Sequence, residues 1–326
     1  MKERILEILK KSNTYVSGQE ICKQLNVSRT AVWKVMNQLK EEGYEIEAIS
    51  NKGYKIKKSP DSITDYELLS QINTKYIAKQ IEYYEEIDST NIRCKILAEE
   101  GAQDGILVVA DQQTAGRGRR GRAWKSPKGS SIAMSLMLKP DIMPSNASML
   151  TLVTAMALVK GINDAAGVDT KIKWPNDIIL NNKKLCGILT EMSSELDYIN
   201  YVVIGIGVNV NMTEFPEEIS HIATSVAIEL GHPAKRADII TKTMEAFEKY
   251  YDIFLKKQNL EDLVEEYNHQ LIHKDREIRV LGSEEEYQAK ALGIDKTGEL
   301  MVELDDGTRK KIRSGEISVR GINGYV

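Results

Sequence analysis

The segment Leu107–Trp124 reads LVVADQQTAGRGRRGRAW and joins a short apolar run to a loop in which arginines and glycines alternate. Glycines at this density allow positive φ angles and a close approach of the backbone to a ligand. Guanidinium groups add a planar set of donors that suits carboxylate and phosphate oxygens. The pattern predicts a mobile loop that closes over an anion, with a solvated basic loop or an RNA-contacting segment as alternatives. The loop residues are Gly116, Arg117, Gly118, Arg119, Arg120, Gly121 and Arg122.

The same glycines match the dinucleotide-binding fingerprint Gly-x-Gly-x-x-Gly at Gly116, Gly118 and Gly121. That fingerprint requires a helix that opens at the third glycine and presents its N-terminus to a pyrophosphate. Pro127 and Gly129 follow closely and would interrupt such a helix. A phosphate-binding P-loop does not fit either, because no Lys-Ser or Lys-Thr pair follows Gly121.

Length and composition predict one to three domains with ordinary cores, since 42% of the 326 residues are hydrophobic. No apolar run reaches the ~18 residues of a membrane-spanning helix, and the first residues do not resemble a secretory signal. The 3 cysteines are widely spaced, which predicts free thiols in the cytoplasm and no disulfide or zinc site. His269 and His273 have helical spacing, but no Glu follows His269, so we interpret them as a helix surface pair and expect no metal site.

Charge divides the chain into a basic amino-terminal part and an acidic body. Residues 1–60 contain 12 Lys or Arg and 7 Asp or Glu, a net charge of +5, whereas the remaining residues carry −9. A basic module on an acidic body indicates a separate role for the first sixty residues.

The basic module predicts a helix-turn-helix. Apolar residues at helical spacing mark a first helix over Ile5–Leu9, and Ser17 with Glu20 fits a capping box at the start of a second. Ser28 caps a third helix, which ends near Gly43. Two helices joined by a tight turn, the second with a polar and basic outer face, are typical of this DNA-binding motif.

Residues 44–56 alternate as a hairpin and add a basic wing, which favours DNA as the partner over another protein. A small helical protein-interaction module is the alternative, because a charged helix face is usually only solvated. Ser59-Pro60-Asp61 marks a domain boundary. The predicted DNA-binding residues are Ser28, Arg29, Thr30, Trp33, Lys34, Asn37 and Lys52.

The central region mixes helix and strand patterns without the regular alternation of a doubly wound sheet, which predicts an α+β domain. Asp65–Ile77 and Ser148–Ala165 are predicted helices, and Ser131–Leu138 is a predicted strand. A further helix begins after Asp88, where free amides and hydroxyls suit an anion or amide ligand. Taken alone, Ser89–Asn91 is simply a helix cap.

Two lysines stand out in the second half of this region. Lys173-Trp-Pro-Asn-Asp177 predicts a corner between two strands, with Lys173 and Asp177 on either side of it. Lys184 enters an apolar strand, which requires an anionic partner unless the ammonium reaches solvent from the strand end. Gly205 and Gly207 interrupt a buried strand and leave room for a group beside its backbone.

The carboxyl-terminal region changes from helices to short strands. Lys235–Lys257 and Leu260–His273 are predicted helices, and four alternating segments follow from Glu277 to Arg313, with a hairpin at Asp305-Asp306-Gly307. The pattern predicts a small barrel that docks on the central domain or on a partner.

Five motifs in this order together resemble the bifunctional biotin–protein ligase and biotin-operon repressor family. They are Asp88–Asn91, Gln112–Trp124, Lys173–Asp177, Lys184–Glu191 and Gly205–Asn209. The resemblance covers the whole chain. It implies a winged helix-turn-helix domain at 1–60, an α+β catalytic domain of the biotin/lipoate-ligase kind at 61–273, and an SH3-like barrel at 274–326.

The resemblance also implies a reaction in two steps. Biotin and ATP, with Mg²⁺, form biotinyl-5′-adenylate and pyrophosphate, and a lysine of biotin carboxyl carrier protein then takes the biotin. The implied catalytic residues are Lys184, Arg119 and Asp177. The implied biotin-binding residues are Ser89, Thr90, Asn91, Gln113, Arg117, Gly118, Arg119 and Lys184. The implied nucleotide-binding residues are Trp124, which would stack on adenine, with Asn176, Asn209 and Arg120.

Regulation follows from the same resemblance. The adenylate-bound protein is expected to form a homodimer in the cytoplasm, with no membrane partner, and to present two wings to the half-sites of an operator. Two other functions remain open at this point. One is a non-catalytic transcription factor that senses a small acid, and the other is a lipoate ligase on the same scaffold.

Overall fold

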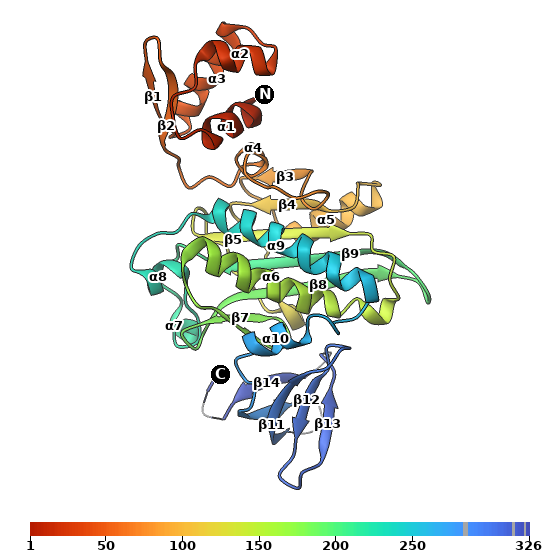
Figure 1. Cartoon of the computed structure of the whole chain (residues 1–326). Coiled ribbons are helices and arrows are strands. Elements are labelled where there is room, and N and C mark those ends of the chain that lie inside the picture. The colour runs from red at the N-terminus through yellow and green to blue at the C-terminus, as the bar shows by residue number, and fades with distance from the viewer. Residues whose placement is uncertain (283–285, 315–316, 323) are drawn as a thin grey trace. The chain divides into compact units, whose positions relative to one another are not determined.

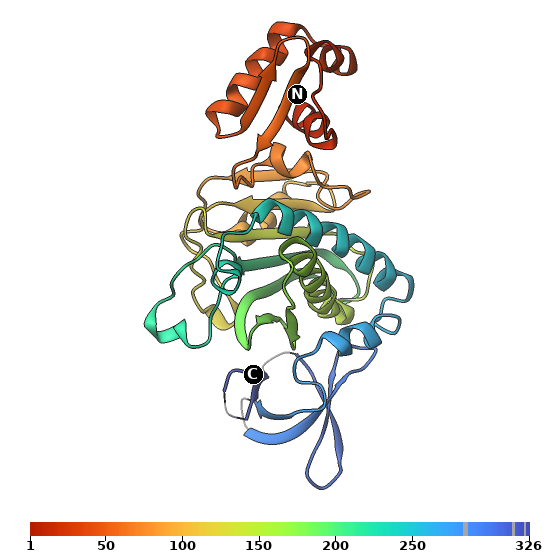
Figure 2. The same ribbon diagram turned by 60° about the vertical axis from the view of Figure 1, so that its left-hand side comes forward.

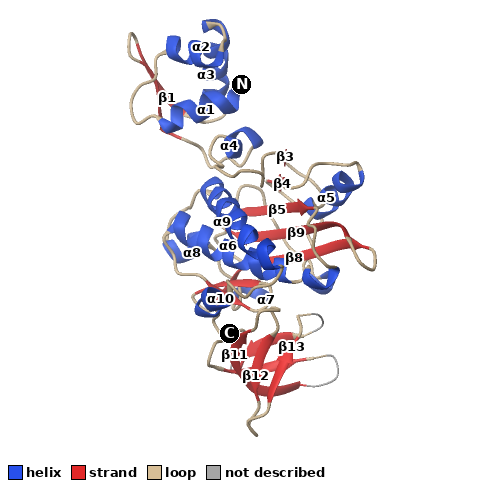
Figure 3. Cartoon of the chain, turned by 45° about the vertical axis from the view of Figure 1, so that its right-hand side comes forward, coloured by secondary structure: helices blue, strands red, loops and turns tan. Residues whose placement is uncertain are grey.

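The computed structural model describes residues 1–282, 286–314, 317–322 and 324–326, and it divides into two compact units, Met1–Asn73 and Thr74–Val326 (Figure 1). The first unit holds helices and one hairpin, and the second holds two sheets with helices (Figure 3). The first unit continues past the boundary suggested at residue 60. The domain limits 1–60, 61–273 and 274–326 remain predictions.

The first unit is a helix-turn-helix with a wing, as predicted. The Ser17 and Ser28 hydroxyls begin the second and third helices by accepting the backbone amides of Glu20 (3.1 Å) and Ala31 (3.2 Å). Helical spacing brings the apolar residues into one core, made of Ile5, Leu6, Leu9, Ile21, Val32, Val35, Met36, Leu39, Tyr44 and Ile46. The elements are α1 (Lys2–Lys11), α2 (Gly18–Leu25), α3 (Arg29–Glu41), β1 (Glu45–Ile49) and β2 (Gly53–Lys58).

A fourth helix, α4 (Asp65–Leu69), belongs to this unit. Its buried Glu67 carboxylate accepts hydrogen bonds from the Tyr44 hydroxyl and the Lys10 ammonium, the latter at 2.5 Å. A buried carboxylate needs such partners, because its desolvation is costly. Glu67 therefore fixes α4 to the winged helix.

The helix predicted over Asp65–Ile77 is too long. It ends at Leu69, and the backbone amides of residues 75–77 donate instead to the Glu248 carboxylate, at 2.7 to 3.1 Å. A carboxylate that accepts several amides competes with the helical hydrogen bonds of that segment. Leu260–His273 is likewise shorter than predicted, because only α10 (Val264–Gln270) is helical.

A mixed sheet of seven strands forms the centre of the second unit, in the order β3-β4-β5-β9-β8-β7-β6. Only β3 and β4 pair in parallel, and the other neighbours are antiparallel. The α+β prediction is therefore confirmed. The strands are β3 (Ile81–Tyr84), β4 (Ile106–Ala110), β5 (Ser131–Leu138), β6 (Lys171–Lys173), β7 (Asp177–Leu180), β8 (Lys183–Ser194) and β9 (Ile199–Asn209).

Helices cover the two faces of this sheet differently. Thr190 on β8 bonds Thr151 of α6 (Met149–Ala166), whereas the next residue, Glu191, bonds Asn91 of α5 (Thr90–Glu99). Since successive strand side chains point to opposite faces, α6 and α5 lie on opposite sides. The long helix α9 (Arg236–Lys257) packs along α6 (Figures 1 and 2).

One segment has the composition of a membrane span, contrary to the expectation from the sequence. Pro144–Ala166, which contains α6, is long and apolar enough to cross a membrane, yet 72% of its 18-residue apolar stretch is buried inside the protein. It packs against both the sheet and α9, as a core helix does. Two short helices, α7 (Glu217–Ser220) and α8 (Val226–Leu230), follow β9.

The last part of the second unit is a five-stranded antiparallel sheet, in the order β13-β12-β11-β10-β14. The indole of Trp174 donates to the Gly298 carbonyl (3.1 Å) and joins this sheet to the central body. The predicted hairpin at Asp305–Gly307 is present between β12 and β13. The strands are β10 (Glu277–Leu281), β11 (Glu286–Ile294), β12 (Leu300–Glu303), β13 (Arg309–Ile312) and β14 (Ser318–Gly321), of which β14 was not predicted.

Candidate active site

A cluster of hydrogen-bonded polar side chains lies where α5 begins against the sheet; we call it the polar cluster. The Gln113 Oε1 oxygen accepts the Thr90 amide (2.8 Å) and faces the Thr90 hydroxyl (3.0 Å). Ser135 Oγ lies 2.7 Å from Thr90 Oγ1 and 2.6 Å from Asn91 Oδ1, and the Asn91 amide donates to Glu191 (2.7 Å). Four sequence segments thus meet in one network that can read a polar ligand.

Ser89 stands at the N-cap position of α5, but its hydroxyl makes no capping hydrogen bond. The Asp88 carboxylate accepts the Ser89 amide instead (2.6 Å), and the Ser89 side chain is buried. Ser89 therefore occupies the predicted cap position without capping the helix through its side chain. Thr90 and Asn91 do more than begin the helix, because they bond Gln113 and Ser135.

Burial and charge act in opposite directions on Glu191, the carboxylate of the polar cluster. Burial alone would raise the pKa of the Glu191 carboxyl. Hydrogen bonds from Asn91 and from Lys95 (2.6 Å), with the positive charges of Lys95 and Arg117, outweigh burial and lower the pKa below its usual value. Glu191 is therefore an ionised acceptor that holds the Asn91 amide in place.

Glycines on β9 make room for these side chains. A Cβ at Gly205 would lie 2.2 Å from Asn91 Oδ1, and a Cβ at Gly207 would lie 2.5 Å from the Trp124 indole. No side chain fits at those distances. Both glycines of the Gly205-Ile-Gly207 motif are thus required by close contacts with site residues.

The arginine loop folds back on itself as a small hairpin. The Gly118 amide donates to the Arg122 carbonyl (2.7 Å), and the Trp124 amide donates to the Gly116 carbonyl (2.9 Å). A single 3-10 turn, Arg119–Gly121, forms the tip, with Arg120 at φ +57°. An extended chain follows this turn, so the rejection of the dinucleotide fingerprint is confirmed.

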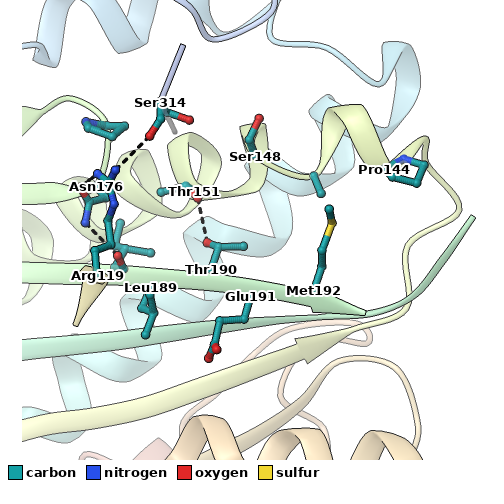
Figure 4. A pocket seen from close by; sticks show the side chains of 13 residues that line it. Arg119, Pro144, Ser148, Thr151, Asn176, Leu189, Thr190, Glu191, Met192 and Ser314 are labelled. Atoms are coloured by element: carbon teal, nitrogen blue, oxygen red, sulfur yellow. Dashed lines mark hydrogen bonds between the residues drawn. The ribbon is translucent and has the colours of Figure 1, made fainter. Parts of the chain in front are cut away.

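The arginines of the loop point to different places. Arg119 donates to Asn176 Oδ1 (2.9 Å) and to the Ser314 carbonyl (3.0 Å) and lines the pocket beside β8 (Figure 4). The charge of the exposed Arg117 acts instead on Glu191 in the polar cluster. Arg119 and Arg117, grouped together from the sequence, thus serve two different neighbourhoods.

A pocket of about 260 Å³ opens beside Arg119, between β8 and the start of α6 (Figure 4). Its polar wall contains Arg119, Asn176 and the hydrogen-bonded pair Thr151 and Thr190. The Asn176 amide also donates to the Ile188 carbonyl (3.0 Å). The pocket presents donors at one end and apolar side chains, including Met192, at the other.

A group of charged side chains lies around the corner predicted at Trp174 and Pro175. We call this group, Lys173, Asp177 and Lys184, the charged cluster. Lys173 and Asp177 pair across β6 and β7, and the Lys184 ammonium lies 2.6 Å from Asp177 Oδ1. The anionic partner that the sequence required for Lys184 is therefore Asp177. Trp174 and Pro175 shape the corner, with the Trp174 ring fully buried.

Charges around Asp177 keep it ionised. Burial would raise the pKa of its carboxyl, but the charge of the ion-paired Lys184, the charge of Lys173 and the hydrogen bond from Tyr325 outweigh that effect and lower it. Burial lowers the pKa of Lys173 to about 8, against the opposing attraction of Asp177. The charged cluster therefore combines an ionised carboxylate with a lysine that loses its proton at a lower pH than an exposed lysine does.

The Trp124 indole lies beside the charged cluster, in contact with Gly207 and Gly187 on the sheet. The Lys184 ammonium lies 5.8 Å from the ring centroid. The indole nitrogen is buried and has no hydrogen-bond partner within the described ranges. The side-chain amide of Asn209 donates to the Thr224 carbonyl (3.1 Å), and the Thr224 amide donates in turn to the Lys184 carbonyl (3.0 Å).

No cluster of three or more His, Cys, Asp or Glu that could hold a metal occurs among the described residues. The interpretation of His269 and His273 as a surface pair is wrong. His269 is exposed on α10, whereas His273 lies beyond the end of that helix and is 2% exposed. Burial and the nearby Lys173 lower the pKa of His273 to about 3, so it is a neutral core residue.

The predicted DNA-binding residues lie on the first unit. Ser28 begins α3, and Arg29, Thr30, Trp33 and Lys34 are exposed on that helix. Asn37 is half-buried on α3, and Lys52 is exposed at the turn of the wing. Trp33 is 57% exposed, which is unusual for an indole without a partner.

Three residues of the site were not singled out from the sequence. Ser135 is one of two hydroxyl residues, with Ser131, in a fully buried strand, a signal that could have been noticed. Glu191 ends the Lys184 motif but had no assigned role. Tyr325 donates its hydroxyl to Asp177 Oδ2 (2.5 Å), across 148 residues of sequence, and no local pattern marks it.

Comparison with known proteins identifies three matching family models. The Biotin/lipoate A/B protein ligase family matches residues 83–209, an HTH domain matches residues 2–55, and the Biotin protein ligase C terminal domain matches residues 273–320. The three matches follow the order of the winged helix, the central sheet and the last sheet.

Similar proteins extend over nearly the whole chain. The bifunctional ligase/repressor BirA of Bacillus subtilis (strain 168) is 40% identical, with 98% of each chain covered. The protein of the same name from Escherichia coli (strain K12) is 28% identical over 93% of this chain and 92% of its own. Among solved structures, the biotin protein ligase from Aquifex aeolicus in complex with biotin and ATP is 30% identical, covers 74% of this chain and 99% of its own, and has a TM-score of 0.67.

Proposed function

The chain belongs to the family of bifunctional biotin ligases and repressors, and we propose that its ligase reaction uses the polar cluster to bind biotin and the charged cluster for chemistry. It is a biotin–protein ligase with a DNA-binding winged helix. The observation that carries the proposal is that Lys184, Asp177 and Trp124 come together on the same sheet that carries the polar cluster.

Biotin would enter with its ureido ring at the polar cluster. A urea presents two N–H donors and one carbonyl acceptor, and the cluster offers hydroxyls and amides of both kinds at Ser89, Thr90, Asn91 and Gln113. Gly118 would allow the loop backbone to approach the ligand. A site with this many hydrogen-bonding groups favours one ligand, because any other ligand leaves some of these groups without a partner.

The first step joins two anions, the biotin carboxylate and the α-phosphate of ATP. The carboxylate oxygen attacks phosphorus, and the bond to pyrophosphate breaks. Lys184 would lie between the anions, with Arg117 and Arg119 adding charge as the loop closes. Mg²⁺ would enter as the Mg–ATP substrate, bound mainly by phosphate oxygens.

The nucleotide would lie between Trp124 and the pocket beside Arg119. The Trp124 ring offers a face for adenine, and Asn176 and Arg120 add donors nearby. Asn209 would act through the backbone it holds. In this arrangement Arg119 bridges the loop and Asn176, so adenylate binding and loop closure are coupled.

The second step transfers biotin to a lysine of biotin carboxyl carrier protein. The amine nitrogen attacks the anhydride carbonyl, the carbon–oxygen bond to phosphate breaks, and AMP leaves as the amide forms. The lysine ammonium loses one proton before attack and a second as the amide forms. The ionised Asp177 would orient that amine and accept a proton, while the closed loop keeps water away from the anhydride.

The test of the ligase proposal is direct. Purified protein with biotin, Mg–ATP and a carrier domain should release pyrophosphate and label the carrier covalently. A carrier left unlabelled would favour a non-catalytic acid sensor, and labelling with lipoate in place of biotin would favour a lipoate ligase. In the same assay Arg119→Ala should release the adenylate faster, because it loses its contacts to Asn176 and Ser314.

A homodimer would present two winged helices to an operator. From Leu189 onward β8 pairs with β9 only, within the ranges that the structure describes, so its other edge can accept a strand. Met192 lies on this edge, and the hairpin beyond it carries Leu196, which is 98% exposed, and Tyr198. Exposed apolar residues at a free edge fit a self-complementary interface.

Two experiments test repression separately from ligation. Sedimentation with biotin and ATP should show a dimer that Leu196→Asp weakens. Removal of Met1–Asn73 should abolish operator binding but leave carrier labelling. Full operator affinity in the truncated protein would disprove the assignment of α3. The proposed location is the cytoplasm, in line with the free thiols of Cys22, Cys94 and Cys186.

A further inference from the structure

The segment after β14 returns to the charged cluster and sets a phenol against Asp177. The Tyr325 hydroxyl donates to Asp177 Oδ2 at 2.5 Å, and the Lys184 ammonium lies 2.6 Å from Oδ1. Each carboxylate oxygen is therefore held by a different group. One comes from the central sheet, and the other follows the last strand of the second sheet.

The ring of Tyr325 contacts a second charged residue of the same cluster. The Lys173 ammonium lies 4.2 Å from the ring centroid, a distance at which the face of an aromatic ring attracts a cation. Tyr325 therefore touches both residues that flank the Trp174–Pro175 corner. Burial and the negative charge of Asp177 raise the pKa of Tyr325, so its hydroxyl stays a neutral donor.

Close packing holds this segment on the second sheet. A Cβ at Gly321 would lie 2.2 Å from the carbonyl carbon of Val326, so only glycine permits the contact. Gly321 itself pairs with Ile278 of β10 at the end of β14. Because Val326 packs against Gly321 at the end of β14, the neighbouring Tyr325 side chain is held in place.

We propose that Tyr325 is a positioning residue for biotin transfer, whose hydroxyl holds the Asp177 carboxylate in the orientation that receives the acceptor lysine. The inference rests on the proposed function, because Tyr325 acts through Asp177. A hydrogen bond to a charged acceptor restricts the carboxylate to one geometry, and fixed geometry is a large part of catalysis. The second sheet thereby takes part in the chemistry, beyond the docking role predicted for it.

Removal of this hydrogen bond should shift the pH dependence of biotin transfer in a defined direction. A donor to the ionised carboxylate lowers the pKa of Asp177, so its removal raises that pKa and moves the acid limb of the transfer rate to higher pH. The other charged or titratable groups around the cluster are Lys184 and the Cys186 thiol on β8, Lys173 on β6, Arg119 and Arg122 in the arginine loop, Arg320 on β14, and His273 beside Lys173.

The experiment is a single-turnover transfer from preformed biotinyl-adenylate to a carrier domain. In Tyr325→Phe, which keeps the ring over Lys173, the rate constant should fall roughly tenfold and the acid limb should shift upward, because a hydrogen bond to a charge is lost. The matched control is Tyr76→Phe. Tyr76 also donates to a carboxylate at 2.5 Å, that of Asp252 in the same unit, and its loss should move neither quantity.

The Asp177→Asn variant separates this inference from the proposed function. If Tyr325 acts through Asp177, adding Tyr325→Phe to Asp177→Asn should slow transfer no further. Transfer at the wild-type rate in Asp177→Asn would overturn the proposed role of Asp177 and the inference with it. A slow Asp177→Asn combined with a wild-type rate in Tyr325→Phe would overturn the inference alone. So would a slow Tyr325→Phe with an unmoved acid limb, which marks a merely structural role.

Discussion

The polar cluster and the charged cluster lie on the same sheet but are built on opposite principles. The polar cluster holds mostly neutral groups, Thr90, Asn91, Gln113 and Ser135, whose hydrogen bonds point at one another. The charged cluster gathers ammonium groups and a carboxylate within a few ångströms. A neutral network selects its ligand because a wrong ligand leaves buried groups without hydrogen bonds. A charged cluster stabilises the charge that develops during a reaction, and its action depends on pH.

Under the proposed function, the polar cluster recognises the biotin ring and the charged cluster carries the chemistry of both steps. A substitution in the polar cluster should alter biotin affinity and leave the pH dependence as it is. One in the charged cluster should alter rates and pH dependence with little effect on the recognition of the biotin ring. The four variants below test this division.

The largest effect is expected for Lys184→Ala. It removes the ammonium that would neutralise the biotin carboxylate and the α-phosphate, and it leaves Asp177 with one partner fewer. Adenylate formation, measured by pyrophosphate release, should fall roughly 1,000-fold, as when a main electrostatic group of an active site is lost. Lys160→Ala, which breaks an exposed ion pair with Asp164 on α6, is the control. A Lys184→Ala enzyme as fast as this control would refute the assignment.

Gly205→Ala should give the next largest effect, and it should be confined to biotin binding. The new Cβ would lie 2.2 Å from Asn91 Oδ1, so Asn91 must move and break its bonds to Ser135 and Glu191. We expect the KM for biotin to rise about 100-fold, since two hydrogen bonds in a buried network are lost. Gly18→Ala, where the nearest atom is at 3.4 Å, should leave it unchanged.

Thr90→Val keeps the shape of the side chain and removes one hydroxyl from the polar cluster. Gln113 and Ser135 each lose a partner, and the KM for biotin should rise roughly tenfold while kcat stays the same. Thr90→Ser should restore most of the affinity, because the hydroxyl returns. A fall in kcat instead, with no change in KM, would place Thr90 in the chemical step and break the comparison.

The sequence predicts part of the site around each cluster and misses the contacts that depend on tertiary structure. Lys184 and Gly205 carry local signals, a charge in an apolar strand and a glycine in a buried one. The sequence does not predict that Arg119 bonds Asn176, because that contact depends on the 3-10 turn at the loop tip. Tyr325 could not be predicted either, since its bond to Asp177 joins residues brought together only by the docking of two sheets.

The smallest effect is expected for Lys173→Met, and it concerns how the free energy of unfolding depends on pH. Burial lowers the pKa of Lys173 to about 8, whereas a lysine in an unfolded chain titrates near about 10.4. Between these values the unfolded chain binds more protons than the folded one, so the free energy of unfolding contains a term that rises with pH. Lys173→Met removes this term, so the variant should lose stability relative to the wild type as pH increases across that window.

The measurement is denaturant unfolding in a Trp33→Phe background, in which the fluorescence of Trp124 and Trp174 reports on the second unit. The control is Thr90→Val, whose free energy of unfolding should change with pH as the wild type's does, because the substitution alters no charge at any pH. A Lys173→Met protein with that same pH dependence would mean that Lys173 titrates as an ordinary surface lysine, and the contrast between the two clusters would lose its electrostatic basis.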